Sequence, residues 1–256
     1  MTRPEPTVVV LPDPGVLAAS VAARLVTALV DAQSLRGVAS VVLTGGTMGM
    51  AALRAVRDSP ARPAVDWRRV DVWWGDERWV AADSPERNDR QAREALLDAL
   101  DLDPALVHPL PSPGALDGDD VEAAAARYAD QLAAAAPAGS DVPTFDVLLL
   151  GMGPEGHTAS IFPESAAAYD ERTVVAVHGC PKPPQTRISL GFAALTAARE
   201  VWLVVAGAEK APMVALALSG AGRVQVPAAG ALGHVQTLWL LDEAAAGQLP
   251  RGLRRR

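Results

Sequence analysis

The 256-residue chain has a single cysteine, Cys180, and only four histidines. One thiol cannot form a disulfide within the chain, which favours a reducing compartment. The sequence also lacks any stretch of about 18 uncharged apolar residues, so no membrane-spanning helix is expected. Its first residues, MTRPEPTVVV, carry proline and charge where a signal peptide needs an apolar run. These absences predict a cytoplasmic protein that does not bind membranes.

Positive charge is in deficit as well. Lys and Arg together number 23 against 30 Asp and Glu, which gives a net charge of −7. This balance argues against nucleic acid or an anionic membrane as the main partner. It leaves room for a small anionic substrate, because a local cluster of Arg and Lys can oppose the overall charge.

Two common kinds of catalytic site lack their motifs. The histidines show neither an i, i+4 pairing nor a cysteine partner, and they stand at positions 108, 157, 178 and 234. A catalytic zinc needs about three protein ligands, and although His157, Glu155 and Asp76 could be assembled into such a set, their spacing does not require it. No G-x-S-x-G sequence marks a serine nucleophile. The sequence therefore predicts a site without a metal.

Short runs rich in valine and leucine alternate with longer segments rich in alanine. This alternation predicts an α/β fold, a mostly parallel twisted sheet with helices on both faces, Rossmann-like. With no linker or repeat in view, we expect one domain over 1–256, as a monomer or small homo-oligomer. The expected strands are 7–11, 38–46, 70–77, 145–150, 173–177, 187–191, 200–207 and 237–242, and the expected helices are 14–33, 47–57, 85–100, 120–136, 209–219 and a short last one.

Ligands of open α/β sheets bind at the carboxyl ends of the strands, and the first loop to consider is LTGGTMGMAAL at 43–53. Gly45 and Gly46 follow a strand, and Thr47 is expected to open a helix. Glycines let backbone N–H groups approach an anion, and a helix N-terminus favours negative charge. The loop is either a phosphate cradle or an ordinary turn with Thr47 as its N-cap.

Charged residues follow three other strands. In VWWGDERWV (72–80), Asp76 and Arg78 come directly after a strand, either in a salt-bridged loop or facing a polar ligand. Arg187 precedes the strand ISL, and Lys210 follows the strand that begins at about residue 200. Arg binds phosphate by paired hydrogen bonds and Lys as a point charge. Each is an ordinary surface charge if taken alone, but with Thr47 they could form one phosphate site.

The segment LGMGPEGHTASIFP (150–163) places His157 in a glycine-rich turn at the end of a strand. A neutral imidazole accepts a proton near pH 7, and Glu155 could hold the ring in the productive tautomer. The alternative is a histidine that merely packs the turn. The strand-end position, the glycines and the nearby acid favour chemistry.

These motifs resemble, in order, those of the 6-phosphogluconolactonase family. LGMGPEGHTASIFP is similar to its histidine signature, WWGDERWV to its Asp-Glu-Arg motif, LTGGTMGMAAL to its glycine loop, and RISLGFAAL and VVAGAEKAPMV to its later arginine and lysine segments. The likeness runs from about residue 8 to 246. It implies hydrolysis of a sugar-phosphate lactone, 6-phospho-D-glucono-1,5-lactone, in the oxidative pentose phosphate pathway, with no organic cofactor. It also implies a fold related to that of glucosamine-6-phosphate deaminase.

The resemblance assigns roles to residues. It implies that His157 is the general base, with Glu155 or Asp76 as the acid that orients it. Asp76 and Asn88 would hold sugar hydroxyls or the water, while the phosphate would lie on Arg78, Arg187, Lys210 and the turn of Gly45, Gly46 and Thr47. The family pattern also has differences here: Glu155 stands where Asp is usual, Met48–Gly49 where Thr-Pro is common, and Arg87 where Ser is usual.

Two alternatives remain besides the lactonase. The first is an enzyme like the deaminase, whose motif ends in Asn-Glu-Pro and whose second motif reads Asp-Glu-Tyr. Here Phe162 replaces that glutamate and Arg78 that tyrosine, and both differences favour the lactonase. The second is a non-catalytic sugar-phosphate-binding protein, which would have less need of His157.

Overall fold

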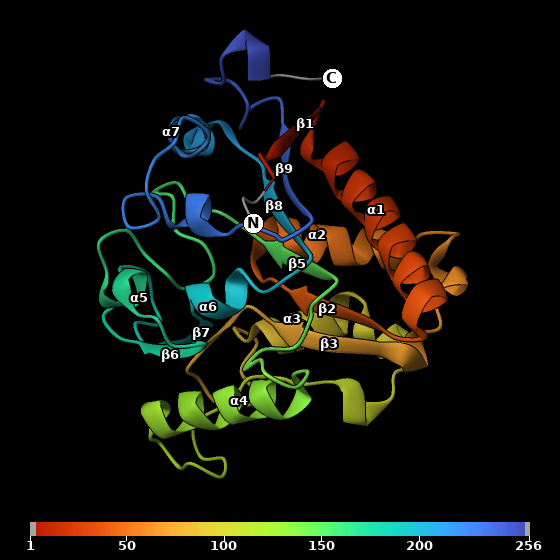
Figure 1. The fold of residues 1–256 in the computed structure, drawn as a ribbon, viewed down its shortest axis with the longest axis vertical. Helices are drawn as coiled ribbons and strands as arrows, with labels where there is room; N and C mark the ends of the chain where they lie inside the picture. The colour runs from red at the N-terminus through yellow and green to blue at the C-terminus, as the bar shows by residue number, and fades with distance from the viewer. Residues whose placement is uncertain (1–3, 254–256) are drawn as a thin grey trace.

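The structure is a computed structural model that describes residues 4–253. Within that range six strands form one wholly parallel sheet, in the order β1-β9-β8-β5-β2-β3. The first strand pairs with the last, so segments from both ends of the chain share one edge of the sheet (Figure 1). The strands are β1 Thr7–Leu11, β2 Ala39–Leu43, β3 Val70–Trp74, β5 Val147–Leu150, β8 Glu200–Val205 and β9 Gln236–Asp242.

Helices connect and cover these strands. Helix α1 packs on α2 and contacts β1, β2 and β9. Figure 1 shows α1 on one side of the main sheet and α5 and α6 on the other, which confirms the expected α/β architecture. The helices are α1 Pro14–Arg36, α2 Gly46–Arg57, α3 Asn88–Ala95, α4 Val121–Ala135, α5 Ala166–Tyr169, α6 Phe192–Leu195 and α7 Ala211–Leu218.

A second, smaller sheet lies beside the first. In the described part of the chain it contains three antiparallel strands in the order β4-β7-β6, with bounds Asp76–Arg78, Arg187–Leu190 and Val174–Val177. Helix α4 packs on β6 and β7. The expected strands at 173–177 and 187–191 therefore exist, but they belong to this sheet and not to the parallel one.

Gly75 joins the two sheets. Its N–H donates to the carbonyl of Leu43 in β2, and its carbonyl accepts from the N–H of Leu190 in β7. The expected strand at 70–77 is consequently split, with β3 in the main sheet and β4 in the small one. The expected helix at 85–100 is also shorter, because α3 ends at Ala95 and a 3-10 turn, Leu97–Ala99, follows.

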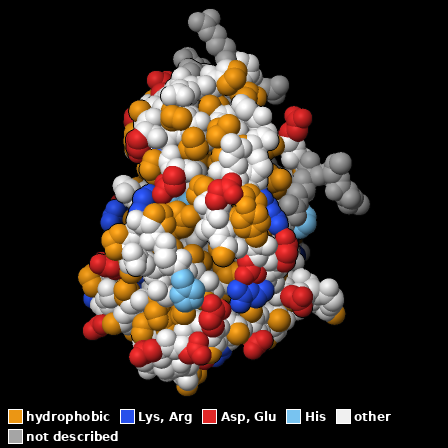
Figure 2. All heavy atoms as spheres, turned by 90° about the vertical axis from the view of Figure 1, so that its left-hand side faces the viewer, with side chains coloured by type: hydrophobic (Ala, Val, Ile, Leu, Met, Phe, Trp, Pro, Cys, Tyr) orange, Lys and Arg blue, Asp and Glu red, His pale blue; other side chains and the backbone are white. Residues whose placement is uncertain are grey.

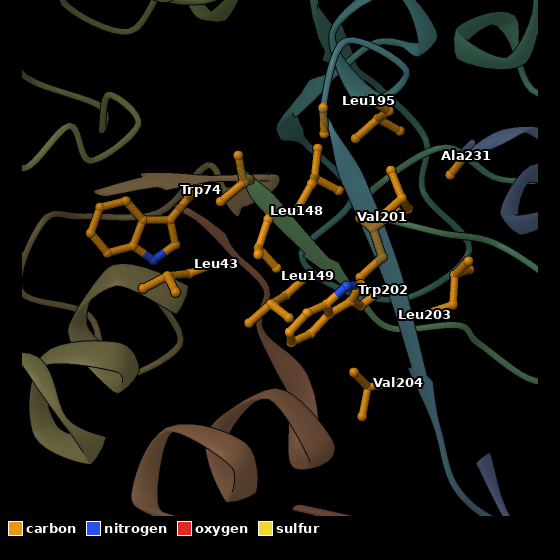
Figure 3. Packing of buried hydrophobic residues seen from close by; sticks show 14 of the residues in the cluster. Leu43, Trp74, Leu148, Leu149, Leu195, Val201, Trp202, Leu203, Val204 and Ala231 are labelled. Atoms are coloured by element: carbon orange, nitrogen blue, oxygen red, sulfur yellow. The ribbon is translucent and has the colours of Figure 1, made fainter. Parts of the chain in front are cut away.

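The core surrounds the central strands, which are buried on both faces. All residues of β2 and β5 are buried, and Figure 3 shows Leu148 and Leu149 of β5 packed between Trp74 of β3 and Trp202 of β8. Apolar burial of this kind contributes about 25 cal/mol per Å². A sheet covered on both faces needs near-continuous apolar strands, which is why short continuous apolar runs in the sequence revealed these strands.

Helix α1 is long and apolar enough, by length and composition, to cross a membrane. Its N-cap is Asp13, whose carboxylate accepts from the N–H of Val16. Its C-cap is Gly37, which has the left-handed conformation with φ +79°. Its buried residues, among them Leu17, Val21 and Leu25, face the sheet. Core helices of globular proteins pass the same length test, and the packing of α1 accounts for its apolar composition. The predicted single domain spans 1–256, of which 1–3 and 254–256 lie outside the described residues.

Candidate active site

A cleft of about 180 Å³ opens at the carboxyl ends of the parallel strands. Segments after β2, β5 and β8 line it, together with β4 and β7 of the small sheet and the start of α3. Of the residues expected from the sequence to form the site, nine line this cleft: Gly45, Gly46, Thr47, Asp76, Arg78, Asn88, His157, Arg187 and Lys210. The tenth, Glu155, lies just behind His157. Residues separated by up to 165 positions are thus brought to one place because parallel strands end at one edge of a sheet.

The glycine loop after β2 leads into helix α2. Helix α2 begins at Gly46 and not at Thr47, and its N-cap is Gly45, whose backbone is extended and which supplies no side-chain hydrogen bond. The first N–H groups of a helix have no partner within the helix, and the helix dipole adds positive potential there. This terminus therefore presents donors to the cleft, as an anion site requires.

Gly45 also makes room for Asn88. A Cβ at position 45 would lie 2.0 Å from Oδ1 of Asn88, so only glycine fits. The amide of Asn88 donates to the carbonyl of Asp76 at 2.9 Å, and its Oδ1 accepts from Arg78 at 2.7 Å. The glycine loop, β4 and the start of α3 are consequently locked together around one amide side chain.

Asp76 is buried at the floor of the cleft. Its Oδ2 accepts from the hydroxyl of Ser160 at 2.6 Å, and its Oδ1 lies 3.3 Å from Nδ2 of Asn88. It is paired with Ser189 across β4 and β7. The carboxylate is thus oriented by a hydroxyl from the histidine segment and by an amide from α3, two elements that no local sequence pattern connects.

Glu77, the middle residue of β4, points away from the cleft and holds the start of α3. Its carboxylate accepts the backbone N–H groups of Arg78, Asn88 and Asp89 at 2.8, 2.8 and 3.0 Å. Burial raises the pKa of Glu77 to about 7, although nearby Arg87 and the three N–H groups act in the opposite direction. An acceptor of several backbone donors at a helix start fixes the position of that helix, and hence of Asn88.

Arg187 is the first residue of β7, as the expected strand 187–191 implies. The residue is 6% exposed, and its guanidinium donates to the carbonyls of Lys182 and Pro184 at 3.1 and 3.2 Å. Nη1 lies 3.5 Å from the hydroxyl of Ser160. The loop between β6 and β7 therefore holds this cation by carbonyl groups alone, leaving its positive charge available to a ligand.

Lys210 ends the 3-10 turn Ala208–Lys210 that follows β8. Together with Arg78 and Arg187 it gives the cleft three cationic side chains, beside the N-terminus of α2. This local positive charge stands in a protein whose net charge is −7. It suits an anionic group such as a phosphate.

His157 lies in a tight turn. The N–H of Gly153 donates to the carbonyl of His157 at 3.0 Å and closes this turn. A Cβ at position 153 would lie 2.1 Å from Nδ1 of His157, so glycine is needed there for the imidazole to fit. Nδ1 is buried and lies 3.2 Å from Oε2 of Glu155, but the two atoms are not aligned for a hydrogen bond. The other nitrogen, Nε2, is left to meet a ligand.

Burial lowers the pKa of His157, although the carboxylate of Glu155 acts in the opposite direction. For Glu155, burial would raise the pKa, but the hydrogen bond from Lys182 and the proximity of His157 outweigh it, so that this pKa is lowered. Nζ of Lys182 lies 2.9 Å from Oε1 of Glu155. The pair thus keeps a neutral imidazole next to an ionised carboxylate at pH 7, the state that a general base requires.

Three residues of the site neighbourhood escaped the sequence analysis. Ser160 orients Asp76, Lys182 pairs with Glu155, and Phe162 stacks on His157 with ring centroids 4.4 Å apart. Ser160 and Phe162 stand in the histidine segment, and this closeness to His157 in the sequence was the available signal. Lys182 lies in a proline-rich loop and gave no signal at all.

Residues 4–253 contain no group of three or more His, Cys, Asp or Glu side chains placed to hold a metal ion. His157 and Glu155 do approach each other, but Asp76 is engaged with Ser160 and Asn88 instead. Asp76 is therefore engaged apart from the pair formed by His157 and Glu155.

Comparison with known proteins shows to which family the chain belongs. A sequence model of the family described as glucosamine-6-phosphate isomerases/6-phosphogluconolactonase matches residues 12–239. A protein of Streptomyces coelicolor named 6-phosphogluconolactonase is 57% identical over 97% of this chain and 96% of its own length. The chain belongs to the 6-phosphogluconolactonase family. The resemblance seen in the motifs, and the prediction of an enzyme of this family, are confirmed.

Solved structures agree with this family membership. The 6-phosphogluconolactonase of Trypanosoma brucei superposes with a TM-score of 0.83 at 32% identity, over 96% of this chain and 99% of the other. A monomeric glucosamine-6-phosphate deaminase superposes with a TM-score of 0.76 at 18% identity, over 94% and 99%. The second likeness concerns the fold alone, and it confirms the expected relation between the two folds.

Proposed function

We propose that the protein hydrolyses 6-phospho-D-glucono-1,5-lactone to 6-phospho-D-gluconate, a step of the oxidative pentose phosphate pathway. One observation carries the proposal: a partly buried imidazole with a lowered pKa shares a cleft with three cationic side chains and a helix N-terminus. The cationic end suits the phosphate, and the imidazole suits the activation of water. The names of the relatives support the same substrate.

In this mechanism His157 is the general base. Nε2 takes a proton from a water molecule as the water oxygen attacks C1 of the lactone, and the imidazolium then returns the proton to the ring oxygen as the C1–O bond breaks. Glu155, 3.2 Å from Nδ1, stabilises the charged ring. General base catalysis of this kind contributes about 10²–10⁴-fold.

The remaining residues bind and orient the substrate. Asp76 and Asn88 hold sugar hydroxyls or the attacking water, and their mutual hydrogen bonds fix their positions. The phosphate lies on Arg78, Arg187 and Lys210, with the N–H groups at Gly45, Gly46 and Thr47. Binding energy from a remote phosphate positions the reacting carbon against the base. We further propose that the reaction needs neither a metal nor an organic cofactor, and that the protein acts in the cytoplasm as a monomer or small homo-oligomer, without nucleic acid or membrane partners.

A lactone assay on freshly generated substrate tests the proposal, with spontaneous ring opening as the baseline. The wild-type protein should accelerate the release of acid, and His157→Ala should lower kcat by about 10²–10⁴-fold. Binding of 6-phosphogluconate to His157→Ala should persist, because the phosphate-binding residues are intact. Wild-type turnover in this variant would exclude the general-base assignment.

The alternatives give different results in the same series. An enzyme like the deaminase needs an acid at position 162, where the structure has a buried phenylalanine, and it would release ammonia from glucosamine 6-phosphate. A non-catalytic sugar-phosphate-binding protein would bind 6-phosphogluconate without accelerating ring opening. Neither outcome is expected.

A further inference from the structure

The imidazole of His157 lies against an aromatic ring. The ring centroids of His157 and Phe162 are 4.4 Å apart and their planes are inclined by 25°, a stacked arrangement. The guanidinium carbon of Arg187 also lies over the Phe162 ring, 5.9 Å from its centroid. The Phe162 ring therefore contacts two side chains that take part in the proposed mechanism, the base His157 and the phosphate-binding Arg187.

Polar contacts hold the imidazole only loosely. In the described part of the chain, Nδ1 of His157 has no hydrogen-bond partner although it is buried. Its neighbour Glu155 is within 3.2 Å but is misaligned, and the carboxylate is held by Lys182 at 2.9 Å instead. The orientation that a carboxylate ordinarily gives to a catalytic histidine is therefore incomplete here.

Phe162, by contrast, is rigidly placed. Its side chain is 4% exposed and belongs to the apolar core. Its carbonyl accepts both the N–H and the hydroxyl of Ser165, at 3.2 and 2.7 Å. A buried ring with a fixed backbone has little freedom to move, so it can serve as a reference surface for a neighbouring ring.

We propose that Phe162 is a positioning residue for the reaction. Its ring sets the plane of the His157 imidazole and keeps water from one of its faces, in place of an orienting hydrogen bond. The inference rests on the proposed function only in so far as His157 is the base. A misplacement of the base by about 1 Å can cost about 10²-fold in rate.

The test compares two buried phenylalanines. Phe162→Leu removes the stacked ring, and Phe192→Leu is its matched control: Phe192 is also buried and also has an arginine over its ring, the Cζ of Arg223 at 4.9 Å, but it is not stacked on a histidine. Phe162→Tyr keeps the aromatic face. If Phe162→Leu does not fold, Phe162→Met takes its place, because the unbranched and flexible methionine side chain adapts more readily to an irregular space.

In lactone hydrolysis, Phe162→Leu should lower kcat by about 10²-fold. KM and the Kd for 6-phosphogluconate should change by less than about 3-fold, since the loss concerns the transition state and not ground-state binding. Phe162→Tyr and Phe192→Leu should both keep kcat within about 3-fold of the wild type. Equal kcat values for the two leucine variants, or a loss confined to KM and Kd, would overturn the proposal.

A second readout does not depend on activity. The Cε1 proton of His157 should show an upfield ring-current shift in the NMR spectrum, which Phe162→Leu abolishes and Phe192→Leu preserves. The pKa of His157, which Glu155, Lys182 and Asp76 also influence, should rise towards its ordinary value when the ring is removed. If the wild type failed to hydrolyse the lactone, the proposed function would be wrong, whereas an unchanged NMR signal in Phe162→Leu would refute the positioning role itself.

Discussion

The four histidines of this chain lie in very different surroundings. Nε2 of His108 is 2.7 Å from a carboxylate oxygen of Asp71, and its ring is stacked on Trp73. His178 is mostly exposed beside Glu122. Among the described residues, His157 is the histidine that lines the cleft. At the scale of the residue, location rather than identity separates a candidate base from a structural histidine.

The direction in which the pKa of His157 is shifted can be tested. A general base must be neutral, so kcat/KM should stay on its plateau down to a pH below 6.5, the ordinary value of a histidine, and then fall. Glu155→Gln removes a charge that favours the imidazolium, so the pKa should fall further and the acid limb should move to lower pH. Rate measurements from pH 4.5 to 8, corrected for spontaneous opening, check this. A limb that moved to higher pH in the variant would contradict it.

Several residue roles could be predicted from the sequence, and others could not. His157, Asp76, Arg78 and Lys210 were found because each follows a strand, and strand ends meet in a parallel sheet. Lys182 pairs with Glu155 of a separate segment, and Phe162 stacks on His157 through the irregular path of one loop. Such contacts depend on the fold in three dimensions and leave no periodicity in the sequence.

At the scale of the element, α3 is held in place by a buried arginine. Arg87 is 2% exposed and donates to the carbonyls of Leu110 and Pro111 at 2.6 and 3.2 Å and to Asp89 at 2.8 Å. Its Nη2 lies 3.7 Å from Glu77. In this chain the residue thus ties the start of α3 to the loop before α4, where the family pattern more often has serine.

Arg87→Ser should therefore destabilise the protein. Removing one partner of a buried, hydrogen-bonded ion pair costs about 3–5 kcal/mol, and the free energy of unfolding measured in urea should fall by about that amount. Arg57→Ser is the control, because Arg57 pairs with Asp58 at the surface, where a change within about 0.5 kcal/mol is expected. A loss no larger than that of the control would show that Arg87 is dispensable.

The strands themselves illustrate what a pattern of apolar residues can predict. It marks which segments are buried, and so the strand positions at 173–177 and 187–191 agree closely with β6 and β7. It does not say which strand pairs with which. The chain changes sheets at Gly75, where one residue bonds to both sheets through its N–H and its carbonyl, and a strand predicted as continuous was in fact two.

At the scale of the whole molecule, charge is spread unevenly. Figure 2 shows the face over β6, α5 and α7, where acidic and basic side chains are interspersed with apolar ones. The cationic groups of the cleft are thus a local feature of an acidic protein. An anionic ligand should be recognised by this site and repelled by much of the remaining surface.

Ligand binding should accordingly raise the thermal stability of the whole chain. At 100 times its Kd, 6-phosphogluconate stabilises the folded state by about 2.7 kcal/mol, which corresponds to a rise in Tm of about 5–11 °C for a protein of this size. Thermal unfolding followed by circular dichroism measures the shift. Gluconate at the same concentration should give a much smaller one, and equal shifts for both compounds would mean that the phosphate is not recognised.

The register of β4 and β7 places Arg78 directly opposite Arg187. Side chains opposite each other on antiparallel strands lie on the same face, and like charges in such a pair repel. Each guanidinium is satisfied by carbonyl, amide or hydroxyl oxygens rather than by a carboxylate. A dianion between them would turn this repulsion into attraction, so the backbone amides of β4 and β7 should exchange their hydrogens more slowly once the cleft is filled. The junction of the two sheets would then be weakest in the empty enzyme and would tighten with each substrate that it binds.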